Sequence, residues 1–310
     1  MSPRIAIVGA GAVGCYYGGR LAQHGYDVHF LLRSDYEAVK QHGLRLRSPL
    51  GDAHIADVQC ARTTSEIGPC DIVFIALKVT SNAVLPHLLP PLLKPGTLLV
   101  TLQNGLGNEE FLSDHFGAER VLGGLCFVCL NRIEAGVIEH IAQGRINLGE
   151  HGRPPQARTH DIAAMLRHSG IECVVEESLA AARWKKLVWN IPFNGLSIVA
   201  GGIDTAAILA DPALEQRVRE LMTEIIATAG QLGHHIPDGL IEDMVERTRT
   251  MTRYQPSSLI DFEAGREVEL EAIWGEPVRH AAAAGLRMPQ VERLYHELQA
   301  CLNRRALARS

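Results

Sequence analysis

The sequence predicts an α/β fold with two domains. Residues 1–177 are expected to form a parallel sheet with an antiparallel extension at its edge, and residues 178–310 an all-helical domain. Three observations predict this organisation: apolar runs alternate with helical patterns in the first half, a glycine-rich turn follows the first run, and strand patterns stop after about residue 178. The length of 310 residues also suits two domains.

Four apolar runs predict buried parallel strands. They cover residues 5–8, 27–32, 71–77 and 97–102. Helical spacing follows the first run over residues 12–24 and stops at Gly25, a residue suited to a helix C-terminal cap. Because strands that alternate with helices are joined by right-handed crossovers, these segments predict a parallel sheet.

The pattern changes between residues 120 and 149, where strand-like segments are joined by turn signals. The signals Glu134-Ala135-Gly136 and Gln143-Gly144 predict the antiparallel extension at the sheet edge. Residues 160–168 predict a helix, and residues 171–176 predict the last strand of this domain.

Helical patterns dominate after residue 178. Asp211-Pro212 predicts a helix start, because aspartate caps the first turn and proline fits its first position. Helical spacing then continues to Gly233, and residues 268–284 and 290–307 predict two more helices. The second domain is therefore expected to be all-helical.

A glycine-rich loop joins the first expected strand to the first expected helix, and it reads Gly9-Ala10-Gly11-Ala12-Val13-Gly14. In this context the spacing is typical of a Rossmann-type domain that binds a nicotinamide dinucleotide. Gly9 would permit the tight turn, Gly11 the approach of the backbone to the pyrophosphate, and Gly14 the packing of helix on strand. We expect all six residues to bind the cofactor; the alternative is a turn without a ligand.

The end of the second expected strand bears on the choice between NADP and NAD. Arg33 stands where a 2′-phosphate would bind, and a guanidinium matches a phosphate well, so we favour NADP (as NADPH). In the alternative, Arg33 is a solvated loop residue and Asp35 binds the ribose hydroxyls, which would indicate NAD.

Lys78 and Asn104 follow two other expected strands. Open parallel sheets bind ligands at the carboxyl ends of their strands, so both residues are candidates for cofactor contact. The segment Asn104-Gly105-Leu106-Gly107 is also compatible with a plain turn.

Lys186, Asn190 and Asn194 are spaced four residues apart and would share one face of a helix. Apolar neighbours indicate that this helix is buried, and Pro192 should bend it. Buried asparagines need hydrogen-bond partners, and a buried lysine needs a counter-charge or a chemical task. The alternative is a solvated polar stripe.

These residue types suit the reduction of a ketone by a nicotinamide enzyme. Such a reaction needs a proton for the developing alkoxide, and Lys186 can supply it as general acid. Asparagine amides both donate and accept hydrogen bonds, so they suit a hydroxy-keto acid. One carboxylate among Glu267, Glu269 and Glu271 could pair with the lysine, and the sequence leaves that choice open.

With these residues, the chain resembles the ketopantoate reductase family over nearly its whole length. The resemblance rests on several separated motifs in the same order, which are the N-terminal glycine loop, Leu77-Lys78, Gln103-Asn104-Gly105, Trp184-Lys185-Lys186-Leu187 with Asn190 and Asn194, Ser257-Ser258-Leu259, and Asp261-Phe262-Glu263-Ala264-Gly265-Arg266 leading to Glu269.

The resemblance implies NADPH-dependent reduction of 2-dehydropantoate to pantoate, a step toward pantothenate and coenzyme A. It implies that Lys186 is the proton donor and that Glu269 lies beside this lysine and the nicotinamide ribose. The residues that it implies for substrate binding are Asn104, which would also lie near the cofactor, Asn190, Asn194 and Ser258.

Two departures from the family pattern concern the substrate. Asp204 stands where the pattern can have a further asparagine, and a carboxylate there would repel an anionic substrate unless it points away. The segment from Ser258 to Glu269 is also one residue shorter than in the usual family pattern.

Two alternatives for the function stay open: a related dehydrogenase of another small 2-keto or 3-hydroxy acid, and a non-catalytic NADPH-binding protein.

Composition excludes several other classes. The net charge is −5 without a cluster of lysine and arginine, which argues against nucleic acid or a membrane surface as partner. The sequence has no apolar run of about 20 residues, which argues against a membrane span.

Seven scattered cysteines suit a reducing compartment, so we expect a cytoplasmic enzyme, as monomer or homodimer. We expect no metal site, because Cys126 and Cys129 lack further ligands at a suitable spacing.

Overall fold

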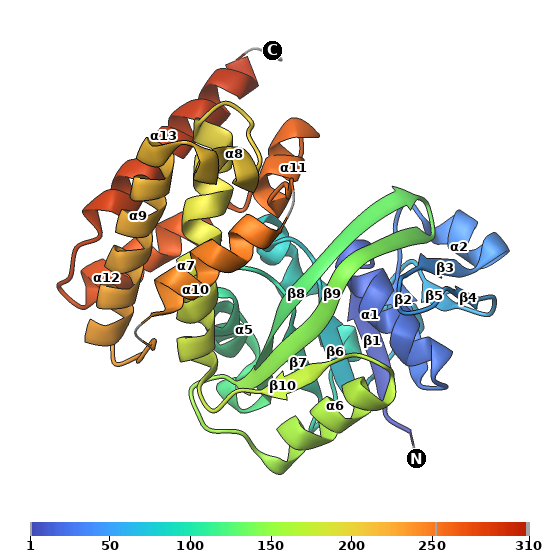
Figure 1. Ribbon diagram of the computed structural model, residues 1–310. Helices are drawn as coiled ribbons and strands as arrows, with labels where there is room; N and C mark the ends of the chain where they lie inside the picture. Colours follow the sequence, from blue (N-terminus) through green and yellow to red (C-terminus); the bar gives the residue numbers. More distant parts are fainter. Residues whose placement is uncertain (1, 238, 252, 308–310) are drawn as a thin grey trace. The chain divides into compact units, whose positions relative to one another are not determined.

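The computed structural model describes residues 2–237, 239–251 and 253–307 (Figure 1). The chain divides into two compact units. The first comprises Met1–Asn104 and Asn108–Leu179, and the second comprises Gly105–Gly107 and Ala180–Ser310. The short segment Gly105–Gly107, which was expected to stay with the sheet, thus packs with the helical unit.

Within the described residues, the first unit contains a mixed sheet of ten strands. The strands are β1 (Arg4–Val8), β2 (Asp27–Leu31), β3 (Leu44–Arg47), β4 (Ala53–Ile55), β5 (Gln59–Ala61), β6 (Ile72–Ile75), β7 (Leu98–Thr101), β8 (Val121–Glu134), β9 (Val137–Glu150) and β10 (Cys173–Val175). Their order is β4-β3-β9-β8-β7-β6-β1-β2-β5, and β10 pairs with β9.

The parallel part of the sheet confirms the four strands expected from the apolar runs. β1 lies between β2 and β6, and β7 pairs with β6 in the same direction. Side chains alternate across this layer: Ile5 and Ile7 belong to one hydrophobic cluster, and Ala6 and Val8 belong to another. Because hydrophobic clusters cover both faces of the sheet, these strands are continuous apolar runs in the sequence.

Helices connect the strands of the first unit. They are α1 (Ala12–Gln23), α2 (Tyr36–His42), α3 (Thr64–Ile67), α4 (Leu85–Leu88), α5 (Asn108–Phe116) and α6 (Ala157–His168), with the short 3₁₀ turns η1 (Val79–Val84), η2 (Pro90–Leu92) and η3 (Ala118–Arg120). The expected end of α1 is confirmed, since Gly25 adopts a left-handed φ of 81° directly after its last turn.

The antiparallel extension is also confirmed, as the long hairpin of β8 and β9 (Figure 1). The hairpin turns at Ala135-Gly136, but the second expected turn is wrong. Gln143 and Gly144 lie inside β9, where φ values of 65° and 121° mark a bulge in the pairing with β8. The sheet also continues past the hairpin, because β9 pairs along its other edge with β3 and β10.

The second unit is helical, as expected. Its elements are α7 (Leu179–Val199), α8 (Thr205–Ala210), α9 (Pro212–Gln231), α10 (Leu240–Thr250), α11 (Ser257–Glu263), the π-helix η4 (Glu271–Gly275), α12 (Glu276–Ala283) and α13 (Pro289–Leu307). The start of α9 is confirmed, because the Asp211 carboxylate accepts a hydrogen bond from the Ala213 N–H at 2.8 Å. The helix expected over residues 268–284 is confirmed from Leu270 to Ala283, but its first turn, η4, is π-helical.

α7 is the core helix of this unit. Trp184, Leu187, Ile191 and Phe193 are at most 2% exposed and pack in one hydrophobic cluster with apolar side chains of the other helices.

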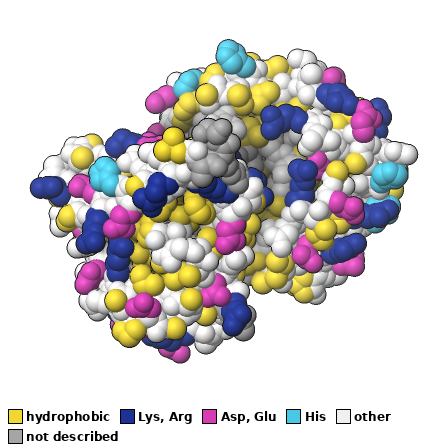
Figure 2. Space-filling model, turned by 90° about the horizontal axis from the view of Figure 1, so that it is seen from above, with side chains coloured by type: hydrophobic (Ala, Val, Ile, Leu, Met, Phe, Trp, Pro, Cys, Tyr) yellow, Lys and Arg dark blue, Asp and Glu magenta, His cyan; other side chains and the backbone are white. Residues whose placement is uncertain are grey.

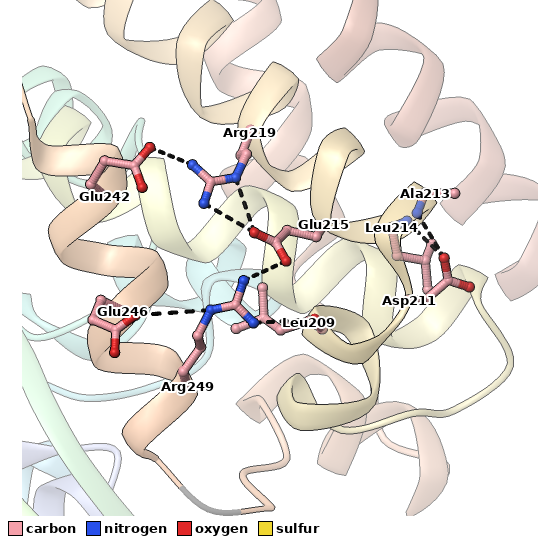
Figure 3. Close-up of polar contacts among 9 residues, drawn as sticks. All are labelled: Leu209, Asp211, Ala213, Leu214, Glu215, Arg219, Glu242, Glu246 and Arg249. Atoms are coloured by element: carbon pink, nitrogen blue, oxygen red, sulfur yellow. Dashed lines mark hydrogen bonds and ion pairs between the residues drawn. The ribbon is translucent and has the colours of Figure 1, made fainter.

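On the outside of the bundle, an ion-pair network joins α9 to α10: Glu215 accepts from Arg219 and Arg249 (Figure 3). None of the helices within the described residues has the length and hydropathy to cross a membrane.

Candidate functional site

The glycine loop has a distinct reason for each of its glycines. Gly9 has a left-handed φ of 101°, and a Cβ on it would lie 2.3 Å from the Leu77 nitrogen after β6. A Cβ on Gly14 would lie 2.3 Å from the Gly9 carbonyl oxygen, so α1 could not pack this closely on the loop. Both positions require glycine for structural reasons.

Gly11 differs because the space in front of it is open. Apart from Gly11 itself and its two neighbours in the chain, no heavy atom of the described residues lies within 4 Å of a Cβ built on Gly11. This residue is also the N-cap of α1 and has no side chain to cap the helix, so backbone N–H groups of its first turn are available to an anion. An open surface over an uncapped helix N-terminus fits the pyrophosphate of a dinucleotide.

Arg33 and Asp35 have different environments after β2. Arg33 is exposed, and its guanidinium has no hydrogen-bond partner among the described residues. The Asp35 side chain is 5% exposed and lies 3.2 Å from the Arg132 guanidinium, and its other oxygen accepts from the Gly136 N–H at 3.4 Å. Both carboxylate oxygens of Asp35 are therefore engaged by residues of the β8–β9 segment, whereas the Arg33 guanidinium is available for a phosphate.

A second arginine near Arg33 was not recognised in the sequence. The Leu32 N–H donates to the Ala61 carbonyl at 2.9 Å, which places Arg62 after the neighbouring strand β5. The Arg62 guanidinium lies 4.2 Å from the centre of the Tyr36 ring and forms an ion pair with Glu37. Strand β5 has only three residues, too short to be identified from periodicity.

Lys78 and Asn104 lie where the carboxyl ends of β6 and β7 lead into loops, and both are half-buried. Lys78 directly precedes η1. The Asn104 backbone carbonyl accepts a hydrogen bond from the Asn108 side chain at 2.9 Å. The Asn108 amide is held in turn by Asn82, at 3.1 Å, and Asn82 by Gln103, at 2.7 Å. This chain of amides, which sequence reasoning missed, fixes the backbone at Asn104.

The lysine and the two asparagines of α7 lie along one helix face, as their spacing predicts. Lys186 is half-buried, whereas its neighbour Lys185 is exposed. Asn190 is half-buried, and no described residue forms a hydrogen bond with its side-chain amide. This face therefore presents a cation and an available amide beside a tightly packed apolar core.

Asn194 is 2% exposed, and both ends of its amide are engaged. The Nδ2 group donates to the Asn190 carbonyl at 3.0 Å, and Oδ1 accepts from the Ser258 N–H at 2.9 Å. Ser258 lies in the first turn of α11, where N–H groups lack partners within the helix. Asn194 thus caps α11 from α7 and brings Ser258 to the face that carries Asn190.

The three candidate carboxylates differ in burial. Glu267 and Glu271 are exposed, while Glu269 is half-buried. Glu271 accepts hydrogen bonds from Arg279 and Tyr295; burial by itself would raise the pKa of Glu271, but these two donors outweigh it and lower that pKa. Of the three, Glu269 is the carboxylate with the most protected setting.

Asp204, which departs from the family pattern, has a structural task. Its carboxylate accepts a hydrogen bond from the Ala207 N–H at 2.8 Å and caps the N-terminus of α8. Asparagine and aspartate are about equally good helix caps, so either residue would suit this position. Within the described residues, no group of three or more histidine, cysteine, aspartate or glutamate side chains is arranged to hold a metal ion.

The chain matches two family models. The model described as "Ketopantoate reductase PanE/ApbA" matches residues 5–153, and that described as "Ketopantoate reductase PanE/ApbA C terminal" matches residues 178–302. Each covers most of one of the two units.

Individual relatives agree with these models. The chain is 42% identical over 301 residues to the 2-dehydropantoate 2-reductase of Nostoc sp., covering 96% of this chain and 94% of the relative. Among solved structures, that of the 2-dehydropantoate 2-reductase from Geobacter metallireducens is 46% identical with a TM-score of 0.93, covering 96% of this chain and 99% of that one. The enzyme of the same name from Methylococcus capsulatus is 36% identical with a TM-score of 0.90, covering 97% of each chain. The chain is therefore an oxidoreductase that belongs to the ketopantoate reductase PanE/ApbA family.

Proposed function

We propose that this protein reduces 2-dehydropantoate to pantoate with NADPH. One observation carries the proposal: α7 presents the half-buried Lys186 and the available amide of Asn190 on one face, in a chain 42% identical to a relative named for this reaction. The same face ends at Asn194, which holds Ser258 beside it. These groups suit an anionic hydroxy-keto acid, which needs both hydrogen-bond donors and acceptors.

For the cofactor, we propose that residues Gly9–Gly14 bind the pyrophosphate and that Arg33 binds the 2′-phosphate of NADPH. The ion pair between Asp35 and Arg132 supports NADPH over NADH, because a buried, ion-paired carboxylate is not available to the ribose hydroxyls of NADH. Lys78, Asn104 and Glu269 are proposed as further cofactor contacts. Bound NADPH would supply the hydride for the C2 carbonyl of the keto acid.

Lys186 is proposed as the general acid. Its ammonium would donate a hydrogen bond to the C2 carbonyl oxygen and transfer its proton as negative charge develops there. Glu269 would hold this lysine in its charged form and in the required orientation. Asn104, Asn190, Asn194 and Ser258 would bind the carboxylate, carbonyl and hydroxyl groups of the substrate, with Asn194 acting mainly through the position of Ser258.

The direct test measures NADPH consumption by the purified protein with 2-dehydropantoate and with a panel of other small 2-keto and 3-hydroxy acids, and repeats the assay with NADH. We expect the highest kcat/KM for 2-dehydropantoate with NADPH. A higher kcat/KM for another acid would overturn the substrate assignment, and tight NADPH binding without turnover of any acid would overturn the proposed activity.

A further inference from the structure

An irregular turn of the second unit leaves one backbone carbonyl without its usual partner. In η4, the Glu276 N–H donates to the Glu271 carbonyl, five residues back, and so bypasses Ala272, whose carbonyl it would reach in an α-helix. The next residue is Pro277, which has no N–H to donate. The π-turn and the proline together deprive the Ala272 carbonyl of a donor from its own helix.

This carbonyl accepts a hydrogen bond from outside the helix. The donor is the Leu106 N–H, at 2.9 Å, from the short segment Gly105–Gly107 that packs with this unit. The Leu106 side chain is 6% exposed and belongs to the hydrophobic cluster around α7. A polar bond and a buried apolar anchor therefore hold the same residue, which restrains both its position and its orientation.

Gly105 makes this contact sterically possible. Its φ is 81°, and a Cβ at this position would lie 2.3 Å from the Ala272 oxygen, closer than any non-bonded contact allows. Any other residue would have to push the Leu106 N–H away from its acceptor. Gly105, Ala272 and Pro277 thus form one local arrangement, which we call the carbonyl clamp.

We propose that the carbonyl clamp is a positioning device for Asn104; the inference rests on the proposed role of Asn104 in binding the keto acid. Asn104 is joined to Gly105 by a peptide bond, and its own carbonyl accepts from the Asn108 side chain at 2.9 Å. Hydrogen bonds therefore hold the backbone at the Asn104 carbonyl and again at the Leu106 N–H two residues later, which confines the directions in which the Asn104 amide can point. Productive binding needs such confinement, because a small misplacement of a binding group reduces the rate strongly.

Two substitutions act on the clamp without touching Asn104 itself. Pro277→Ala restores an N–H that competes with Leu106 for the Ala272 carbonyl, and we expect kcat/KM for the keto acid to fall by about tenfold. Gly105→Ala introduces the steric conflict, and we expect a fall on the order of 100-fold. Pro212→Ala is the matched control, because Pro212 opens α9 in the same way that Pro277 lies in the first turn of α12, and we expect it to leave kcat/KM unchanged.

Combination with Asn104→Ala distinguishes positioning from a general structural role. If the clamp acts through Asn104, the double variants Asn104→Ala/Gly105→Ala and Asn104→Ala/Pro277→Ala should be no slower than Asn104→Ala alone, within about twofold. The NADPH Kd, measured by fluorescence, should change no more in the two clamp variants than in Asn104→Ala, because Asn104 is itself a proposed cofactor contact while the glycine loop and Arg33 are untouched.

Additive effects in the double variants, or wild-type kcat/KM in a folded Pro277→Ala variant, would overturn the inference. Pro277→Ala keeps the test decisive if Gly105→Ala does not fold. Failure of the proposed function has a different signature, because the wild-type protein itself would then not turn over the keto acid with NADPH. If only the proposed role of Asn104 is wrong, Asn104→Ala alone would leave the KM and kcat for the keto acid unchanged.

Discussion

The side-chain carbonyl of Asn194 accepts a hydrogen bond from the Ser258 N–H at 2.9 Å, which joins the core helix α7 to the start of α11. Both residues are at most 3% exposed, so water cannot replace this bond. The same amide donates to the Asn190 carbonyl one turn earlier. One buried side chain thus connects two residues proposed to contact the substrate.

Substitution of Asn194 is expected to reduce stability and activity together. Asn194→Ala leaves the Ser258 N–H buried without an acceptor, and the free energy of unfolding should fall by about 1–3 kcal/mol. The KM for the keto acid should rise, because Ser258 and Asn190 lose their common support. Urea unfolding and steady-state kinetics measure the two effects, and the exposed Asn303→Ala on α13 is the control. A variant with normal stability would contradict the capping role.

The two adjacent lysines of α7 provide an internal comparison for acid catalysis. Lys186→Ala should lower kcat by about 10²–10⁴-fold, the usual contribution of a positioned general acid. Lys185→Ala should keep kcat near the wild-type value, because Lys185 is exposed and lies on a different helix face. Measured kcat values for the two variants check this directly. Equal losses would indicate a general effect of charge, and near-normal turnover in Lys186→Ala would disprove the assignment.

Local signals predicted much of this architecture. The glycine loop, the end of α1 at Gly25 and the start of α9 at Asp211 depend on the φ angles and capping bonds of a few consecutive residues, which the sequence displays. The spacing of Lys186, Asn190 and Asn194 likewise needs only a helix to bring them onto one face.

Features that depend on distant partners could not be predicted in this way. Gln143-Gly144 looks like a turn, but pairing with β8 on one side and β3 and β10 on the other keeps β9 continuous through it. The spacing of three alternating glutamates did not separate Glu269 from its two neighbours; the family resemblance named it, and the structure adds that it is the half-buried one of the three. The π-turn before Pro277 leaves the Ala272 carbonyl to the distant Leu106 N–H, a partner that no local pattern indicates.

Cofactor preference should depend on Arg33. Its loss would remove the proposed charge-assisted hydrogen bonds to the 2′-phosphate, each contributing about 1.5–3 kcal/mol, so Arg33→Ala should raise the KM for NADPH by about 10- to 100-fold. The KM for NADH, which lacks this phosphate, should stay nearly constant. Kinetics with both cofactors check the prediction, with the exposed Arg47→Ala on β3 as control. Equal changes in the KM values for NADPH and NADH would show that Arg33 does not bind the 2′-phosphate.

The buried His140 of β9, which is 3% exposed, should make the free energy of unfolding depend on pH. Its Nε2 lies 3.1 Å from the Gln143 carbonyl, which can only accept, so this nitrogen carries the proton. Nδ1 then accepts from the Ser48 hydroxyl at 2.8 Å, and that hydroxyl accepts from Arg20 at 2.9 Å. Both ring nitrogens are satisfied only in the neutral form.

Burial, together with the charge of Arg20, lowers the pKa of His140. The unfolded chain, in which histidine has a pKa of about 6.5, therefore binds a proton more readily than the folded chain. The contribution of neutral His140 to the free energy of unfolding should be fully present above the unfolded-state pKa of about 6.5. It should be lost as the pH falls from this pKa toward the lower folded-state pKa. The free energy of unfolding, measured in urea between about pH 5 and pH 8, should have a smaller slope in His140→Gln than in the wild type. The exposed His160→Gln on α6 should retain the wild-type slope. An unchanged slope in His140→Gln would show that this histidine does not couple protonation to folding.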